Sequence, residues 1–296
     1  MAKYVLNSFP AGRGNVLEFP PKLEKKLTQL VQEHNVKWSL EKSSSGGKRN
    51  KRRQKVLKLN IEGLASEVNC VMMAVQEEIV THHVELEGDG PIEFPEEWEE
   101  MGDLTTKTVS LNPSSDEWRK VSQKFQQTLP LTRIVEITRI QNKWLWEKYV
   151  FQRKRMHVKN DGNVNELELF HGTRSNDPKL IYENEVGFDM RYSNSGMWGQ
   201  ANYFAEKASY SDSYAHRTYN GYKEMFFAKV LTGDSFDCHS DSSLRKPPFK
   251  PTGSTGGGLQ FAQVQYDTVT GYTHGSQVYM TYDNEKAYPA YLIKYQ

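Results

Sequence analysis

Four consecutive residues in the middle of the sequence combine an imidazole, a flexible backbone position, a hydroxyl and a cation. An alternating segment at 166–170, ELELF, is followed directly by His171, Gly172, Thr173 and Arg174. The alternation predicts a strand, so His171 would stand at a strand end, where an imidazole can accept a hydrogen bond or a proton. A single histidine in such a place is more often structural than catalytic, and these residues alone leave both roles open.

Aromatic and hydroxyl side chains follow at fixed offsets. Tyr203, Phe204 and Ala205 begin this group, and Ser211 and Tyr214 lie eight and eleven residues after Tyr203. Two tyrosine rings and a serine hydroxyl suit a flat polar ring that carries positive charge. The alternative is an aromatic-rich core, which is the usual role of Tyr and Phe.

A third group lies in GSQVYMTYD (275–283), which alternates as a strand. The alternation places Val278 and Met280 on one face and Gln277 and Tyr279 on the other. Val278 can neither accept a hydrogen bond nor act as a base. A β-branched side chain is also what a buried strand ordinarily carries.

These groups in this order resemble the poly(ADP-ribose) polymerase superfamily of ADP-ribosyltransferases. The matching segments are HGTR, YFA with its serine and tyrosine, YDTVTG (266–271) and YPAYLIKY (288–295). The resemblance extends over about residues 93–296 and is strongest to the macrodomain-associated mono-ADP-ribosyltransferases. It implies an α+β fold, the ADP-ribosyltransferase fold with a largely antiparallel split β-sheet, with NAD+ as co-substrate and no metal. No macrodomain is present, which leaves a fragment and a reduced relative as alternatives.

The resemblance also implies roles for single residues. The family's three catalytic positions correspond to His171, Tyr203 and Val278. The positions that hold the nicotinamide end of NAD+ correspond to Gly172, Thr173, Ser211 and Tyr214. His171 would bond the 2′-hydroxyl of the nicotinamide ribose, and the Gly172 backbone would hold the carboxamide. Ser211 would donate to the carboxamide oxygen, Tyr214 would stack on the ring, and residues 187–198 would form a loop over the pocket.

Two departures from the family pattern carry consequences. Polymerising relatives have Glu at the position of Val278, where the carboxylate activates an ADP-ribose hydroxyl for elongation. Val278 therefore predicts transfer of one unit to an acceptor with its own nucleophile, such as Glu or Asp. Ala201 stands where relatives usually have Gly, and a requirement for positive φ or for close backbone approach there would impair NAD+ binding.

The first 92 residues predict a separate small α/β module. Up to residue 60 there are 14 Lys or Arg against 4 Asp or Glu, whereas residues 61–103 contain 13 acidic residues and no Lys or Arg. Periodicity predicts a strand at 17–19, a helix after Pro20 and Pro21, strands at 36–41 and 55–63, and a helix at 63–80. This β-α-β-β-α order resembles KH-like or RRM-like modules. We expect a boundary near residue 92, and therefore a catalytic domain at 93–296.

A basic loop at 48–55 joins the two predicted strands of this module. Its cations include Lys48, Arg49, Lys51, Arg52 and Arg53. Such a loop could contact RNA or other phosphates without base specificity. A solvated, disordered hairpin loop or part of a localisation signal is the alternative.

The composition indicates the cellular compartment and the class of protein. Net charge is +1, and only Cys70 and Cys238 are present, which favours a reducing cytosolic or nuclear compartment. No apolar run predicts a signal peptide or a membrane span. Short, strand-rich residues 1–92 do not resemble the helical regulatory domain of DNA-damage-activated relatives. The main alternative to a mono-ADP-ribosyltransferase is a scaffold that binds RNA or protein with weak or no transfer activity; modification of nucleic acid is a third hypothesis.

Overall fold

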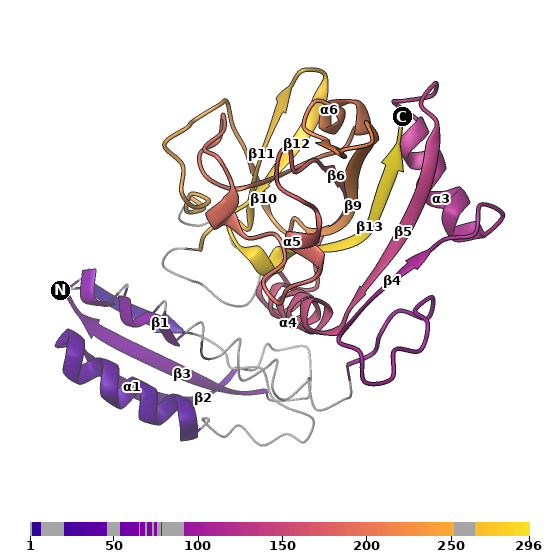
Figure 1. Ribbon diagram of the computed structural model, residues 1–296. Helices are drawn as coiled ribbons and strands as arrows, with labels where there is room; N and C mark the ends of the chain where they lie inside the picture. Colours follow the sequence, from indigo (N-terminus) through magenta and orange to yellow (C-terminus); the bar gives the residue numbers. More distant parts are fainter. Residues whose placement is uncertain are drawn as a thin grey trace. The chain divides into compact units, whose positions relative to one another are not determined.

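The computed structural model describes residues 2–6, 21–45, 54–64, 66–68, 70–72, 74–75, 78, 92–251 and 264–296. Contacts between residues divide the chain into two compact units. One combines Met1–Pro91 with Phe249–Gln265, and the other combines Ile92–Pro248 with Tyr266–Gln296. Each unit has a β-sheet of its own (Figure 1).

The smaller unit contains a three-stranded antiparallel sheet in the order β1-β3-β2. Its elements are β1 (Ala2–Leu6), α1 (Pro21–His34), β2 (Lys37–Ser45) and β3 (Gln54–Gly63). Because β3 pairs antiparallel with both neighbours, β1 and β2 run in the same direction, with α1 between them in the chain. This connectivity is a split β-α-β unit.

The core of the smaller unit forms between α1, β3 and helical residues after β3. Leu27 and Leu30 of α1 are buried together with Leu59 and Ile61 of β3. The helical residues add the buried side chains Val68, Val71, Met72 and Val75. The predicted first helix and the two strands after it are therefore present.

One feature of this unit was not predicted from the sequence, and two predicted features lie outside the described residues. The first strand of the sheet is Ala2–Leu6, which the alternation pattern did not predict. The strand predicted at 17–19 lies outside the described residues, as does the basic run Lys48, Arg49, Lys51, Arg52 and Arg53. The KH-like or RRM-like identity of the module stays a prediction.

Within the described residues, the larger unit contains a sheet of ten strands. Their order is β10-β11-β12-β7-β6-β9-β13-β5-β4, with β8 paired to β9. The strands are β4 (Thr106–Ser110), β5 (Ile134–Asn142), β6 (Glu166–His171), β7 (Asn202–Ala205), β8 (His216–Arg217), β9 (Lys223–Leu231), β10 (Ser235–Asp237), β11 (Thr268–Thr273), β12 (Ser276–Thr281) and β13 (Ala287–Tyr295). All pairs are antiparallel except β10 with β11. The predicted α+β class with a largely antiparallel sheet is confirmed.

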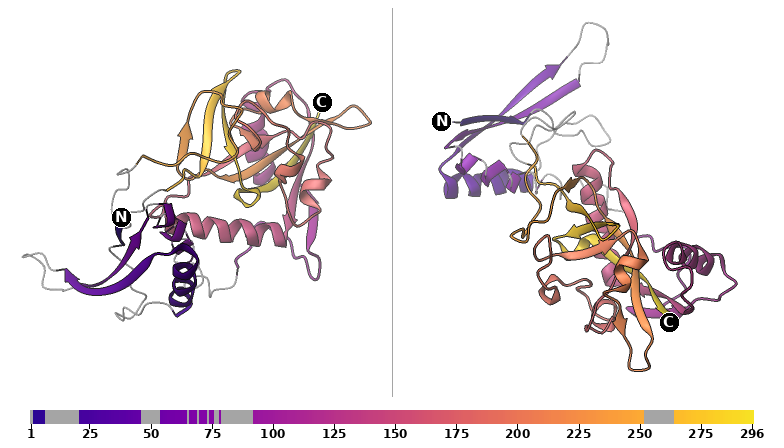
Figure 2. Two further views of the ribbon diagram at one scale, coloured as in Figure 1. Left: turned by 90° about the vertical axis from the view of Figure 1, so that its left-hand side faces the viewer. Right: turned by 90° about the horizontal axis from the view of Figure 1, so that it is seen from above.

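Helices cover this sheet and connect its strands. They are α3 (Asp116–Gln126), α4 (Lys143–Lys159), α5 (Lys179–Tyr182) and α6 (Ala208–Asp212), with 3-10 turns η1 (Met190–Tyr192) and η2 (Asn284–Lys286). Figure 2 shows α4 as the long helix beside the sheet, where it contacts β5 and β13. Ser115 caps the N-terminus of α3, since its Oγ accepts the Trp118 N–H at 3.1 Å.

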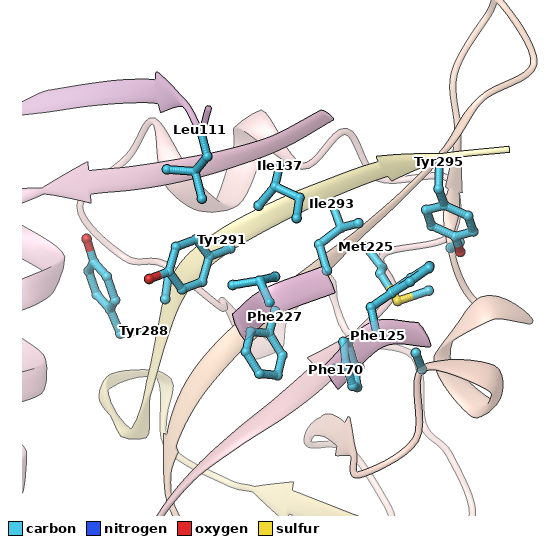
Figure 3. Packing of buried hydrophobic residues seen from close by; sticks show 14 of the residues in the cluster. Leu111, Phe125, Ile137, Phe170, Met225, Phe227, Tyr288, Tyr291, Ile293 and Tyr295 are labelled. Carbon is cyan, nitrogen blue, oxygen red and sulfur yellow. The ribbon is translucent and has the colours of Figure 1, made fainter. Parts of the chain in front are cut away.

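Strand β9 is buried on both faces, and this fixes the middle of the sheet. Phe227 packs in a cluster with Phe170 of β6, Phe125 of α3 and Tyr291 of β13, as Figure 3 shows. The adjacent Phe226 points to the opposite face, into a second cluster. Because both faces are packed, the end of β6 is held rigidly, and His171 stands at that end.

Two sequence-based expectations concern membranes and thiols. In the part of the chain that the structure describes, no helix combines the length and the apolar character needed to cross a membrane. Cys70 and Cys238 are both free.

Candidate active site

His171 is a neutral imidazole with one ring nitrogen already in use. Its Nδ1 lies 2.7 Å from the backbone oxygen of Tyr203. A carbonyl oxygen can only accept, so Nδ1 carries the hydrogen and Nε2 keeps an acceptor lone pair. The rings of Phe188 and Phe204 pack against the imidazole with centroids 5.0 and 5.2 Å away. Burial lowers the pKa of His171 to about 4, so the ring stays neutral at pH 7.

Gly172 is required by the protein's own backbone. A Cβ at this position would overlap the backbone carbonyl of Tyr214. The same carbonyl accepts the Arg174 N–H at 2.7 Å. Next to it, Thr173 is buried and its hydroxyl donates to the Asn176 oxygen at 2.7 Å. The segment after β6 is thereby fixed against the segment that carries Tyr214.

Ser211 and Tyr214 are positioned by the short helix α6. Ser211 is buried, and its Oγ donates to the backbone oxygen of Phe170 at 3.1 Å. In this structure the Ser211 hydroxyl hydrogen is therefore bonded within the protein, whereas the family resemblance implied that it is donated to the carboxamide oxygen. The Tyr214 ring lies beside Tyr210, at a centroid distance of 5.3 Å, and beneath the Arg174 guanidinium, whose Cζ is 4.6 Å from the ring centroid.

Tyr203 holds the loop that precedes it. Its hydroxyl donates to the Gly199 oxygen at 2.7 Å and accepts the Trp198 N–H at 3.0 Å. Burial raises the pKa of Tyr203, which keeps the hydroxyl protonated and able to donate. A Cβ on Gly196 would lie 2.7 Å from the Tyr203 hydroxyl. Tyr203 thus supports the loop with its hydroxyl and orients His171 with its backbone.

Val278 is fully buried in β12 and faces an apolar cluster. It pairs with Ala205 of β7 and Gly271 of β11. The cluster contains Trp198, Ala201, Ala205, Val269, Val278 and Met280, with Tyr203 packed against it. Val278 therefore supports β7, the strand that carries Tyr203, and does not line the cavity described next. The predicted alternation is present, because Val278 and Met280 are buried while Gln277 and Tyr279 are half-buried.

A cavity of about 540 Å³ joins most of these residues. Its lining includes His171, Gly172, Thr173, Tyr203, Ser211 and Tyr214. Residues from 187 to 198, which the sequence predicted as a covering loop, form much of the remaining wall. This size lies in the range typical of small-molecule sites. Six of the seven predicted site residues thus share one cavity.

Polar side chains that the sequence did not single out pin this loop. Asn202 donates to the Phe188 oxygen at 2.6 Å and accepts from the Ser193 hydroxyl at 3.0 Å. Asn284 of η2 accepts the Met190 N–H at 3.0 Å. A single asparagine gives no sequence signal for such contacts, which join residues 9, 14 and 94 positions apart in the chain.

Ala201 lines the cavity, and its backbone does not have the positive φ that one of the two conditions named. It is buried in the apolar cluster and is absent from the non-glycine residues with positive φ in the described chain. The position with positive φ is Gly199, at 76°. A Cβ on Gly199 would overlap the backbone oxygen of Leu244. The glycine that this loop requires is therefore present two residues before Ala201.

Metal-binding clusters are absent from the described residues, where no group of three or more His, Cys, Asp or Glu side chains is suitably placed. The arrangement instead offers an acceptor nitrogen, two tyrosine rings and a closely approached backbone in one cavity. Chemically, it can bind and orient a flat polar ring attached to a hydroxylated sugar.

Comparisons with known proteins identify the family of this chain. The family model described as the poly(ADP-ribose) polymerase catalytic domain matches residues 115–296. Human protein mono-ADP-ribosyltransferase PARP14 is 36% identical over 210 residues, which cover 69% of this chain and 11% of that protein. The probable poly [ADP-ribose] polymerase DDB_G0278045 of Dictyostelium discoideum is 36% identical over 212 residues, covering 69% and 57%. Mouse protein mono-ADP-ribosyltransferase PARP12 is 32% identical over 209 residues, covering 70% and 28%.

The chain spans less than two thirds of the length of each of these relatives. The family match nevertheless covers the cavity and every residue that lines it. It confirms the resemblance inferred from HGTR and the segments that follow, and the chain belongs to the poly(ADP-ribose) polymerase family by virtue of its catalytic domain.

Proposed function

We propose that this chain transfers one ADP-ribose unit from NAD+ to a protein side chain and releases nicotinamide. The observation that carries the proposal is the neutral His171 imidazole, whose Nε2 remains an acceptor at a cavity shared with Ser211 and Tyr214. Relatives named mono-ADP-ribosyltransferases support the same reaction class.

The cavity residues fit the nicotinamide end of NAD+. His171 would accept a hydrogen bond from a ribose hydroxyl, because Nδ1 already donates to the Tyr203 backbone. The Tyr214 ring supplies an aromatic face for the nicotinamide ring. When NAD+ is bound, the bond from the ribose to nicotinamide breaks, its electron pair leaves with nicotinamide, and the acceptor oxygen forms the new bond to the ribose.

The charges around the cavity favour an acceptor that is already a nucleophile. Asp189 is the one carboxylate that lines the cavity in the described chain. It is held by Arg191 at 2.6 Å, and this contact lowers the pKa of Asp189. Since Val278 cannot act as a base either, we infer that an ionised Glu or Asp of the target protein attacks directly. The same absence of a carboxylate at Val278 supports transfer of one unit without elongation.

Incubation of the purified chain with NAD+ labelled on the adenine side tests the proposal. A single sharp labelled band on a denaturing gel is expected, with loss of label in His171→Ala and removal of label by hydroxylamine, which cleaves carboxylate esters. A ladder of products would contradict the single-unit proposal. No label on this chain or on added proteins, with no binding of an uncleavable NAD+ analogue, would favour the scaffold hypothesis instead.

A further inference from the structure

Arg174 is the one Lys or Arg that lines the cavity within the described residues. Its side chain is exposed, and in this part of the chain no carboxylate lies within ion-pair distance of it. Asp189, the carboxylate that lines the cavity, is paired with Arg191 outside the lining, and the two charges cancel. Arg174 therefore supplies the cavity with one uncompensated positive charge.

The backbone of Arg174 is fixed although its side chain is not. Its φ is 54°, in the left-handed region that few non-glycine residues adopt. The Arg174 N–H donates to Tyr214 at 2.7 Å, and the Arg174 oxygen accepts from the His216 ring at 3.0 Å. These bonds hold the base of the side chain beside Tyr214, while the long, rotatable stem can carry the guanidinium to another partner.

In this structure the partner of the guanidinium is the Tyr214 ring. Its Cζ lies over that ring, 4.6 Å from the centroid. A guanidinium in this position makes a cation–π contact. The proposed function uses the same ring to stack nicotinamide, so the guanidinium and an incoming ring compete for Tyr214.

NAD+ itself offers the guanidinium a better partner. Its diphosphate carries two negative charges, and arginine binds phosphate oxygens through two parallel N–H bonds. We propose that Arg174 lies on Tyr214 in the free protein and moves to the diphosphate of NAD+ when the dinucleotide binds. Arg174 then couples binding of the diphosphate to binding of nicotinamide, because a guanidinium on the diphosphate leaves the Tyr214 ring free for nicotinamide. This inference rests on the proposed function.

The exchange predicts effects of opposite sign for benzamide, a mimic of nicotinamide, and for ADP-ribose, the rest of the substrate. In Arg174→Gln, benzamide should bind about threefold more tightly, because no cation has to be displaced from Tyr214. ADP-ribose should bind about tenfold more weakly, because a charge-assisted contact to the diphosphate is lost. A merely structural role for Arg174 would weaken both ligands together.

Isothermal titration calorimetry of the full chain with benzamide, with ADP-ribose and with the uncleavable analogue carba-NAD+ tests this. Arg174→Lys should keep ADP-ribose affinity within about threefold of the unmodified chain, because the charge remains. Arg119→Gln is the matched control, an exposed arginine of α3 that pairs with Asp116 at 2.7 Å, and it should change neither affinity. The salt dependence of ADP-ribose binding should be smaller in Arg174→Gln.

The possible outcomes distinguish failure of the Arg174 exchange from failure of the proposed function. Benzamide binding that tightens while ADP-ribose binding weakens supports the exchange. If both ligands bind the unmodified chain, and Arg174→Gln weakens both or neither, the exchange is wrong and the proposed function is untouched. If the unmodified chain binds none of the three ligands, both the exchange and the proposed function are overturned.

Discussion

At the scale of single residues, the chemistry of the site depends on which atoms are already bonded. His171 has its tautomer set by the Tyr203 backbone, and Ser211 has its hydrogen directed to Phe170. The Tyr203 hydroxyl donates a hydrogen bond to Gly199 and accepts one from Trp198. The spacing of these residues in the sequence was enough to predict that they belong together. It carried no information on donor and acceptor roles, because those are set by backbone groups from other strands.

Because His171 is neutral in the folded protein, the free energy of unfolding should fall as the pH is lowered into the acid range. Burial lowers the pKa of His171 from 6.5 to about 4, so the unfolded chain binds this proton more readily than the folded chain. The stabilisation is fully present above pH 6.5 and is lost as the pH falls from 6.5 through 4. We expect the melting temperature to drop more steeply over this range in the unmodified protein than in His171→Asn, whose amide N–H can replace the Nδ1 donor.

The two proteins differ only at position 171, so the difference between the two pH profiles isolates His171. Parallel profiles from pH 7 to 4.5 would show that the imidazole is not held neutral. A steeper profile in His171→Asn would reverse the sign of the argument.

A polar atom in the side chain at position 278 should lower the free energy of unfolding. Val278 is 0% exposed in its apolar cluster. Val278→Thr keeps the shape and buries one hydroxyl, which should lower the free energy of unfolding by roughly 1–3 kcal/mol. Val278→Glu should cost more, because the carboxyl must be buried. Denaturant unfolding measures both.

Val109 of the edge strand β4 provides the control, since it is a half-buried valine in the same sheet. Val109→Thr should change the free energy of unfolding by about 0.5 kcal/mol or less. Equal losses in the two threonine variants would mean that the packing around Val278 is looser than its burial indicates.

At the scale of elements, length decided what could be predicted. The helix α1 and the strands β2, β3, β6 and β12 were expected from periodicity and are present. Strand β4 and helix α5 were not expected, because they are five and four residues long and carry too little pattern. Strand β1 was missed for the same reason, and its place in a sheet depends on pairing with β3, more than fifty residues away.

The loop from 187 to 201 should depend on Gly199 for two separable reasons. Gly199 has φ of 76°, and a Cβ there would also overlap the Leu244 oxygen. Gly275 has the same φ of 76° with nothing within 4 Å of such a Cβ. Gly275→Ala should therefore cost only backbone strain, about 1 kcal/mol of unfolding free energy. Gly199→Ala should cost more and should also weaken benzamide binding, because Tyr203 bonds the Gly199 oxygen.

Thermal unfolding and benzamide titration of the two alanine variants distinguish strain from steric overlap. Equal melting temperatures and unchanged benzamide affinity in both would show that the loop adjusts without cost and that Gly199 is not needed for the cavity.

At the scale of the whole molecule, the chain contains separate cores. The smaller unit buries Leu27 and Ile61 in a cluster of its own. The larger unit buries Phe227 and Phe226 in two different clusters on the two faces of its sheet. The charge asymmetry of the sequence predicts two modules, but charge carries no information on contacts between residues far apart in the chain, from which the two units are defined. Cores without shared side chains can lose their packing independently.

Calorimetry should therefore resolve two unfolding transitions, of which only one responds to carba-NAD+, because the proposed site lies in the larger unit. Leu27→Ala should lower the unfolding free energy of the transition that carba-NAD+ does not shift, by roughly 2–5 kcal/mol. Phe227→Ala should lower the unfolding free energy of the transition that carba-NAD+ shifts, by roughly the same 2–5 kcal/mol. Both side chains are almost fully buried, so the two variants are matched in burial. A single transition shifted equally by both variants would show that the units unfold as one cooperative body. The smaller unit would then contribute directly to the stability of the catalytic fold, and variants in its core would lower ligand affinity as well.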